Sequence, residues 1–130
     1  MVEDMATHYE LNYDWSKLGP TPWTEMSLVK LQADFHSYDD GDQLWLTISR
    51  WWEAMEKDDT GVAFDGGCFF PAPVRVSTEH VTAWICSHGE DAFDSIAHYA
   101  EELRAVAESA DPEVTATWTE LPHTVDQAER

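Results

Sequence analysis

Residues 87–110, SHGEDAFDSIAHYAEELRAVAESA, carry the clearest helical pattern in the chain. Their apolar side chains recur at spacings of three and four positions, which places them on one stripe of an α-helix. The stripe consists of Ala92, Phe93, Ile96, Ala97, Ala100, Leu103, Val106 and Ala107. Most of the remaining positions are polar or acidic, so we expect a helix that buries one face and presents an acidic ridge on the other.

Both ends of this helix have sequence signals. Ser87 is a suitable N-cap, and Glu90 stands three residues later in the capping-box position. Asp91 and Asp94 lie near the positive end of the helix dipole, where acidic side chains are stabilising. Asp111 precedes a proline and is therefore pushed out of the α conformation. The sequence thus predicts one long helix over residues 87–110.

The chain before this helix alternates between strand and helix periodicities. Residues 7–15 alternate apolar and polar side chains and predict a half-buried strand. Residues 28–36 fit both periods, and we favour a strand. Residues 44–57 keep helical spacing, with Asp42 as the expected N-cap.

Glycine and proline divide the middle of the chain into short strands. Residues 62–70 predict a strand interrupted at Gly66-Gly67 by a bulge or turn. Residues 74–76 and 81–86 are also strand-like, but their apolar phases differ by one residue. A bend near Thr78-Glu79 would reconcile the two phases.

The predicted elements form one domain. Residues 113–121 supply the last strand, so the domain spans residues 1–121, and residues 122–130 are expected to be a flexible C-terminal tail. The order of the elements predicts an α+β fold, a mainly antiparallel sheet of four to five strands with two helices on one face. A ferredoxin-like split βαβ core is the specific arrangement that we expect.

Charge is the most unusual property of the composition. The 130 residues include 26 acidic and 7 basic side chains, for a net charge of −19, and the acids are spread along the chain. A hydrophobic content of 43% indicates a folded domain rather than a disordered acidic chain. Such a surface repels nucleic acid and anionic membranes, and it attracts cations or a basic protein surface.

The sequence also has features that bear on compartment. No apolar run approaches the roughly 18 residues of a membrane span, and residues 1–15 lack a basic start followed by an apolar block. We therefore expect a cytoplasmic protein, in the host cell cytoplasm if it is phage-encoded. Cys68 and Cys86 are then expected to be reduced, with a disulfide between them as the alternative.

The sequence contains residues that can bind metals, but their spacing is not that of a known metal site. His80, Cys86 and His88, with Cys68, are of the right types for zinc, but no Cys-x-x-Cys pair is present. The run 39–42, DDGD, does not fit a calcium-binding EF-hand loop. We expect neither a metal nor another cofactor.

Asp94 and His98 on the long helix are a further candidate site. Asp94 and His98 lie one turn apart, with Glu101 within reach, which suits a metal clip or an acid–base pair. No second pair accompanies them, so a solvated helix face is the simpler interpretation. The chain also lacks a glycine-rich phosphate loop and a Gly-x-Ser-x-Gly elbow. We therefore expect a protein that is not an enzyme.

Seven tryptophans are the second unusual feature. Trp51 and Trp52 lie about 100° apart around a helix, so both cannot face the same core. Trp45 and Trp52 share a face. An apolar island around Trp45 and Trp52, with acidic side chains at its rim, is a plausible docking surface because tryptophan is enriched in binding hot spots. The expected rim consists of Asp39, Asp42, Glu53 and Glu56.

These features lead to one preferred hypothesis, an acidic inhibitor that binds a basic nucleic-acid-binding protein or nuclease complex by placing carboxylates where phosphates would lie. Phage DNA mimics of the anti-CRISPR or anti-restriction type, and nuclease immunity proteins, act in this general way, although no motif of either group is present. The expected partner-binding residues are Asp39, Asp40, Asp42, Trp45, Trp52, Glu53, Glu56, Asp91, Asp94, Glu101 and Glu102.

Two alternatives remain open on the sequence alone. The acidity can be an adaptation of a halophile to high salt, with an unknown function. The chain can also be a small enzyme or ligand-binding domain with a tryptophan-lined pocket that uses His80, His88 or His98. Direct binding to nucleic acid or to a membrane is not expected, and a homodimer is compatible with the sequence.

Overall fold

One long central strand organises the sheet. The computed structural model describes residues 9–10, 12, 14–15, 27–38, 41–88, 92–122 and 124–125. The elements in chain order are β1 (Ser27–His36), α1 (Asp42–Glu53), β2 (Glu56–Lys57), β3 (Ala63–Asp65), β4 (Cys68–Phe70), β5 (Val74–Ser77), β6 (His80–His88), α2 (Ala92–Ala110), β7 (Thr115–Glu120) and β8 (Thr124–Val125).

In the described part of the chain, the strands form one antiparallel sheet of eight strands. Its main path runs β2-β3-β4-β6-β1-β7, while β5 also pairs with β6 and β8 with β1. Because β6 and β7 both run antiparallel to β1, they are parallel to each other, and α2 connects them across β1. The predicted α+β class with an antiparallel sheet is confirmed. The sheet is larger than the predicted four to five strands.

The core lies on one face of this sheet. Along β1, Val29, Leu31, Ala33 and Phe35 are fully buried, as the alternation of side chains in a strand requires. Leu31 pairs with Ile85 of β6, and the neighbouring pairs continue the same apolar face. The apolar stripe of α2 packs on this face, with its buried positions at Ala92, Ile96, Tyr99, Ala100, Leu103 and Ala107.

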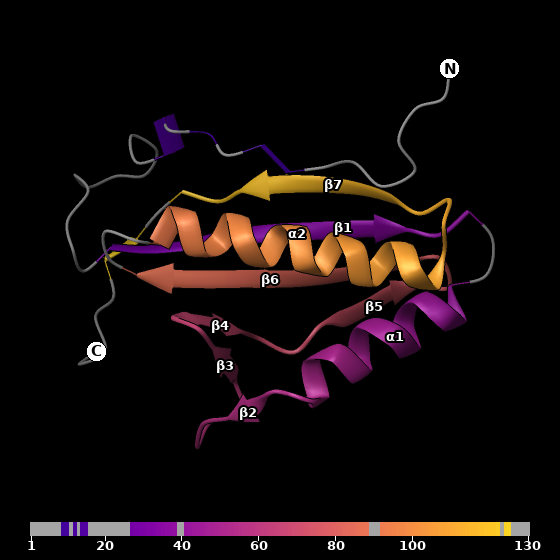
Figure 1. The fold of residues 1–130 in the computed structure, drawn as a ribbon, viewed down its shortest axis with the longest axis horizontal. Coiled ribbons are helices and arrows are strands. Elements are labelled where there is room, and N and C mark those ends of the chain that lie inside the picture. Colours follow the sequence, from indigo (N-terminus) through magenta and orange to yellow (C-terminus); the bar gives the residue numbers. More distant parts are fainter. Residues whose placement is uncertain are drawn as a thin grey trace.

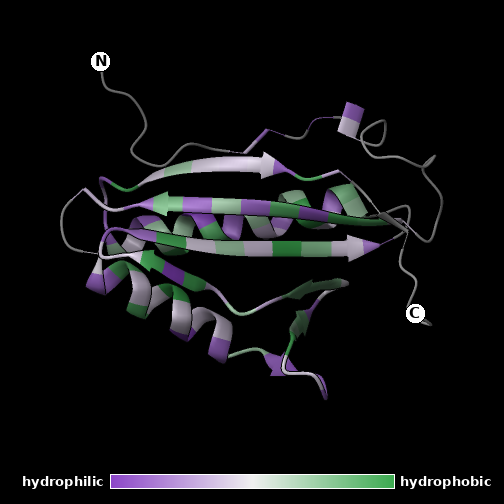
Figure 2. Ribbon diagram, turned by 180° about the vertical axis from the view of Figure 1, so that it is seen from behind, coloured by the Kyte–Doolittle hydropathy of each residue, from purple (hydrophilic) through white to green (hydrophobic). Residues whose placement is uncertain are grey.

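The two helices lie side by side. In Figure 1, α2 runs along β1 and β6, while α1 lies next to β5 and packs against α2. Leu44 and Ile48 are the buried residues of α1. Figure 2 shows the opposite face of the sheet, on which no helix lies in front of the strands. None of the helices in the described part of the chain has the length and apolar character needed to cross a bilayer.

The predicted N-caps were wrong for both helices. Ser87 belongs to β6, where its hydroxyl donates to the carbonyl of Gly67, and α2 begins at Ala92. The helix α1 has Gly41 at its N-cap, with no side-chain cap, and Asp42 is its first residue. A glycine is required at position 41 because a Cβ there would collide with the carbonyl of Thr78.

The first predicted strand is also corrected. Among the described residues of 7–15, none is in a strand, and Asp14 and Trp15 form a short 3₁₀ turn. The alternation nevertheless predicted burial correctly at Trp15, which is fully buried and donates from Nε1 to the carbonyl of Leu121 at 2.6 Å.

Within the expected C-terminal tail, Thr124 and Val125 pair with β1.

The other predicted elements are confirmed with shifted ends. The strand of 28–36 is β1, and the helix of 44–57 is α1, which ends earlier at Glu53 so that Glu56 and Lys57 can form β2. Gly66-Gly67 forms the turn between β3 and β4, and Thr78-Glu79 the turn between β5 and β6. The long helix ends at Ala110, directly before Asp111-Pro112, and β7 is the last predicted strand.

Candidate partner-binding surface

A groove separates the C-terminal end of α1 from β3 and α2. Its volume is about 530 Å³, and its lining combines aromatic and acidic side chains. The lining residues are Trp51, Ala54, Met55, Glu56, Phe64, Asp65, Gly66 and Glu102. Three of these eight residues are carboxylates and none is basic, so the groove is a negative site that also has aromatic and aliphatic side chains in its lining.

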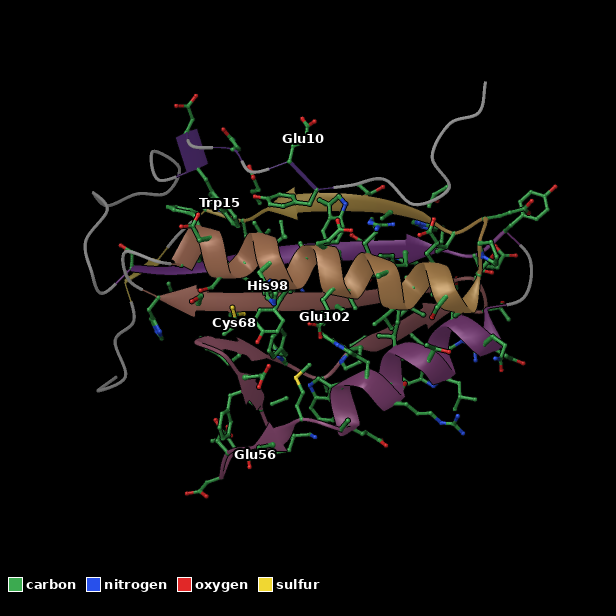
Figure 3. The ribbon with its side chains drawn as sticks, viewed as in Figure 1. Glu10, Trp15, Glu56, Cys68, His98 and Glu102 are labelled. Atoms are coloured by element: carbon green, nitrogen blue, oxygen red, sulfur yellow. The ribbon has the colours of Figure 1, made fainter. Side chains whose placement is uncertain are left out.

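Trp51 joins the two helices at this groove. Its indole Nε1 donates a hydrogen bond of 2.9 Å to Oε2 of Glu102 on α2. The same indole packs edge-on against Phe70, with ring centroids 5.4 Å apart. Figure 3 shows Glu102 on the side of α2 toward α1, with Glu56 farther out on β2. The bond keeps Glu102 at the wall of the groove.

Asp65 is held on the opposite wall. The hydroxyl of Tyr99 on α2 donates to Oδ2 of Asp65 at 2.5 Å. This hydrogen bond, together with burial, raises the pKa of Tyr99 well above its ordinary value, so Tyr99 remains a neutral donor. Gly66, at φ +55, gives the hydroxyl its space, because a Cβ there would overlap it. Asp65 therefore has a defined position rather than a freely rotating side chain.

The rim of the groove comes from paired strands. Glu56 of β2 pairs with Phe64 of β3 across the antiparallel ladder. Phe64 is one of the large apolar side chains that stay exposed, at 43%. The groove thus unites apolar and acidic contacts in one place.

The predicted island of Trp45 and Trp52 lies on another side of α1. Both indoles line a hollow of about 110 Å³ with Glu53, Ala72 and Pro73. Glu56 of the predicted rim lines the larger groove instead.

Trp52 is engaged within the chain at two points. Its Nε1 donates to the carbonyl of Phe70 at 2.8 Å, and the ammonium of Lys57 lies 4.5 Å from the centroid of its ring. Lys57 also donates to the carbonyls of Trp52, Glu53 and Met55 at the end of α1, as a cation at a helix C-terminus does. Trp52 therefore anchors α1 to β4, whereas Trp51 faces the groove.

The predicted ridge on α2 is exposed. Asp94, Glu101 and Glu102 all face solvent, but Glu101 is paired with Arg104, which donates to it at 2.5 Å and also bonds Glu108. Pairs of this spacing within one helix contribute only about 0.2–0.5 kcal/mol each to stability.

The acids around the start of α1 have a different setting. Asp42 forms an ion pair of 2.7 Å with Arg75 of β5. Asp39, Asp40 and Asp91 lie outside the described residues.

A hydrogen-bonded cluster lies on the helix-free face of the sheet. Asp34 accepts from Thr82 at 2.6 Å and from Gln32 at 2.9 Å, and it lies 2.8 Å from Nε2 of His80. Burial raises the pKa of Asp34, but the hydrogen bonds from these three residues outweigh it and hold the pKa below its ordinary value. The ring of His36 stacks on that of His80, with centroids 4.1 Å apart.

This cluster does not have the geometry of a nucleophilic triad. In such a triad the histidine contacts the acid through one nitrogen and the hydroxyl through the other. Here Nε2 of His80 is the nitrogen near both Asp34 and the hydroxyl of Thr82. Thr82 is also buried, with 5% of its surface exposed.

The three histidines of the enzyme hypothesis are far apart. His80 and His88 are the first and last residues of β6, so they are separated by about 26 Å along the strand. His98 lies on α2, on the other face of the sheet (Figure 3). None of them lines the cavities described above.

The candidate metal ligands are likewise dispersed. Within the described residues, no group of three or more histidine, cysteine, aspartate or glutamate side chains is arranged to hold a metal ion. Cys68 and Cys86 are both free and buried. Burial is the main cause that raises their pKa values, to about 11 for Cys68 and about 12 for Cys86.

Sequence reasoning missed the groove for a structural reason. Its residues come from α1, β2, β3 and α2, and only Glu56 and Glu102 were expected to take part in binding. The one available signal was the angle between Trp51 and Trp52, which implied that one indole faces away from the core.

No family model, curated protein or solved structure significantly matches this chain.

Proposed function

We propose that this protein is a non-enzymatic inhibitor that binds the basic surface of a nucleic-acid-handling protein, with the groove between α1, β3 and α2 at the centre of the contact. The observation that carries this proposal is the combination of held carboxylates, Asp65 and Glu102, with the aromatic side chains of Trp51 and Phe64. Its targets would be nucleases or nucleic-acid-binding complexes, and its site of action the cytoplasm.

The chemistry of the groove matches arginine better than other side chains. A guanidinium group stacks on an aromatic face and donates two parallel hydrogen bonds to a carboxylate. Proteins that bind nucleic acid present such groups in rows to contact phosphates. A groove that offers both kinds of contact can therefore take an arginine from that row.

Carboxylates that are already held in place suit the binding of a cationic side chain better than freely rotating ones. Ordering a long side chain on binding costs about 0.5–1.5 kcal/mol. Because Trp51 already holds Glu102 and Tyr99 already holds Asp65, that cost has been met on folding. The groove is thus preorganised for a cationic partner.

The rest of the acidic surface acts at longer range. A net charge of −19 can raise the association rate with a basic cleft by about 10-fold to 1,000-fold. The same field opposes direct binding to nucleic acid. The other expected contact residues, Asp42, Trp45, Trp52, Glu53, Asp94 and Glu101, would supply this field and the periphery of the contact.

A competition experiment tests the proposal. The purified protein is added to nucleases and DNA-binding complexes from its host, and displacement of labelled DNA is measured at low salt and at physiological salt. We expect displacement of at least one target, with an affinity that falls as salt rises. Failure to displace DNA from any of these targets would overturn the proposal.

Matched variants locate the contact. The triple variant Glu56→Gln, Asp65→Asn and Glu102→Gln removes three charges from the groove and retains acceptor oxygens for Tyr99 and Trp51. The control variant Asp59→Asn, Glu79→Gln and Glu113→Gln removes three exposed charges elsewhere. The groove variant should lose much more affinity than the control. Equal losses would show that only total charge matters and that the groove is not the contact.

A further inference from the structure

A second cavity lies along β7, at the opposite edge of the sheet from β2 and β3. Its volume is about 410 Å³, and its lining residues are Tyr9, Glu10, Ala116, Thr117, Trp118 and Glu120. In Figure 3, Glu10 lies beside β7, across the molecule from Glu56. The cavity is therefore separate from the groove of the proposed function.

Two aromatic rings meet at an angle in this cavity. The centroids of Tyr9 and Trp118 are 5.7 Å apart, and their planes are inclined by 57°. Phe35 supports Trp118 from the core in an edge-on contact of 5.8 Å. The rings of Tyr9 and Trp118 are therefore inclined to each other, and Phe35 packs against Trp118. The period of two residues along β7 places Ala116, Trp118 and Glu120 on the same side of that strand.

A carboxylate is fixed next to these rings. Glu120 accepts a hydrogen bond of 2.5 Å from the hydroxyl of Tyr9 and one of 2.9 Å from Nδ2 of Asn12, on different oxygens. Burial, followed by the bond to Glu120, raises the pKa of Tyr9 well above its ordinary value, so Tyr9 adds no second charge. Glu10 supplies a further, exposed carboxylate.

We infer that this cavity binds a methylated ammonium group, from choline or from the side chain of a trimethylated lysine. Angled aromatic faces beside negative charge form the aromatic cage that attracts quaternary ammonium ions. The two hydrogen bonds that Glu120 accepts hold its carboxylate in place beside the rings, so its charge can attract a cation that has no N–H group to donate. None of the six lining residues is basic.

The test follows the indole N–H signals of ¹⁵N-labelled protein during titration at constant ionic strength. The ligands are choline, a peptide with one trimethyllysine, and the uncharged analogue of choline in which a tert-butyl group replaces trimethylammonium. Trp118→Phe assigns the signal of Trp118. We expect a saturable shift of that signal with choline, with the peptide or with both, and the responding ligand identifies the source of the group.

Three comparisons make the result decisive. The uncharged analogue should bind about 2-fold to 30-fold more weakly than choline, since it lacks the cation–π attraction. Glu10→Gln should weaken choline binding, whereas Glu113→Gln, a charge change outside the lining, should not. Trp118→Phe should weaken binding and Trp118→Leu should abolish it.

Two outcomes would overturn the inference. One is the absence of a saturable shift with both cationic ligands. The other is equal binding of choline and its uncharged analogue, which would mark an ordinary apolar cavity. If Trp118→Leu proves unfolded by circular dichroism, the wild-type comparison of the two ligands and the effect of Glu10→Gln still decide the question.

Discussion

The indole of Trp51 on α1 donates a 2.9 Å hydrogen bond to Glu102 on α2 and at the same time lines the groove that those residues share. One contact therefore docks the two helices and orients a carboxylate of the proposed binding site. It has this dual role because Trp51 lies on the flank of α1 that faces α2, whereas the adjacent Trp52 points to β4.

Replacing Trp51 by phenylalanine should lower the free energy of unfolding by about 1 kcal/mol. The smaller ring can still pack against Phe70, but the hydrogen bond to Glu102 is lost, and a bond of this kind is worth about 0.5–1.5 kcal/mol. Urea denaturation followed by circular dichroism measures the change. In a double-mutant cycle, Glu102→Ala should have little further effect in the Trp51→Phe background. Fully additive effects would show that the two side chains are not coupled.

Gly66→Ala should destabilise the protein more than Gly61→Ala. Both glycines have positive φ, at +55 and +88, so each alanine introduces backbone strain of about 1–2 kcal/mol. Only at Gly66 does the new Cβ overlap the hydroxyl of Tyr99, which would have to release Asp65. Thermal unfolding of both variants gives the comparison, and an equal loss of stability would argue against the Tyr99 contact.

The cluster around Asp34 should contribute to stability in a pH-dependent way. Its folded-state pKa lies below the ordinary value of 3.8, so its contribution is present above that pH and is lost as the pH falls through the folded-state pKa. Asp34→Asn does not titrate. Its free energy of unfolding should be lower than that of the wild type at pH 7, and the difference between the two should become smaller as the pH falls.

Urea denaturation between neutral pH and about pH 3 measures this difference. Glu113→Gln serves as the control, because Glu113 is exposed and its replacement should leave the loss of stability at low pH unchanged. A gap between Asp34→Asn and the wild type that stays constant with pH would mean that Asp34 does not titrate differently in the folded state.

Folding should not require high salt. The core is made of fully buried apolar side chains on β1, β6 and α2, and their burial does not depend on ions. Added salt should only screen repulsion among the exposed acids and raise the melting temperature modestly. Melting curves in dilute buffer and in molar potassium chloride test this. An unfolded chain in dilute buffer would instead support salt adaptation as the reason for the acidity.

Periodicity predicted the elements that are both long and regular. The alternation of 28–36 appears as β1, and the helical spacing predicted over 87–110 appears as α2, which begins at Ala92, because a single buried face imposes one period on the whole element. The same reasoning failed at 7–15. There, Trp15 is buried and Glu10 exposed as expected, but the described residues form no strand, and Asp14 and Trp15 form a 3₁₀ turn. A turn can bury one side chain against the core without any strand pairing.

Local end signals were less informative than periodicity. Ser87 has the chemistry of an N-cap, yet its hydroxyl bonds the carbonyl of Gly67 and its backbone belongs to β6. The pairing of β6 with β4 decides this outcome, and β4 lies about twenty residues earlier in the chain. A capping preference of about 1 kcal/mol cannot compete with a strand in the middle of a sheet.

The sequence by itself determined the class of the fold, the faces that α2 and β1 bury, and the negative charge of the surface, because these depend on composition and on spacing within one element. Only the tertiary structure decided which carboxylates lie beside which aromatic rings. Glu102 accepts a hydrogen bond from Trp51, which is 51 positions away in the chain, and Glu120 accepts one from Tyr9, which is 111 positions away. These contacts follow from the register of the sheet and the docking of the helices, which no local pattern encodes.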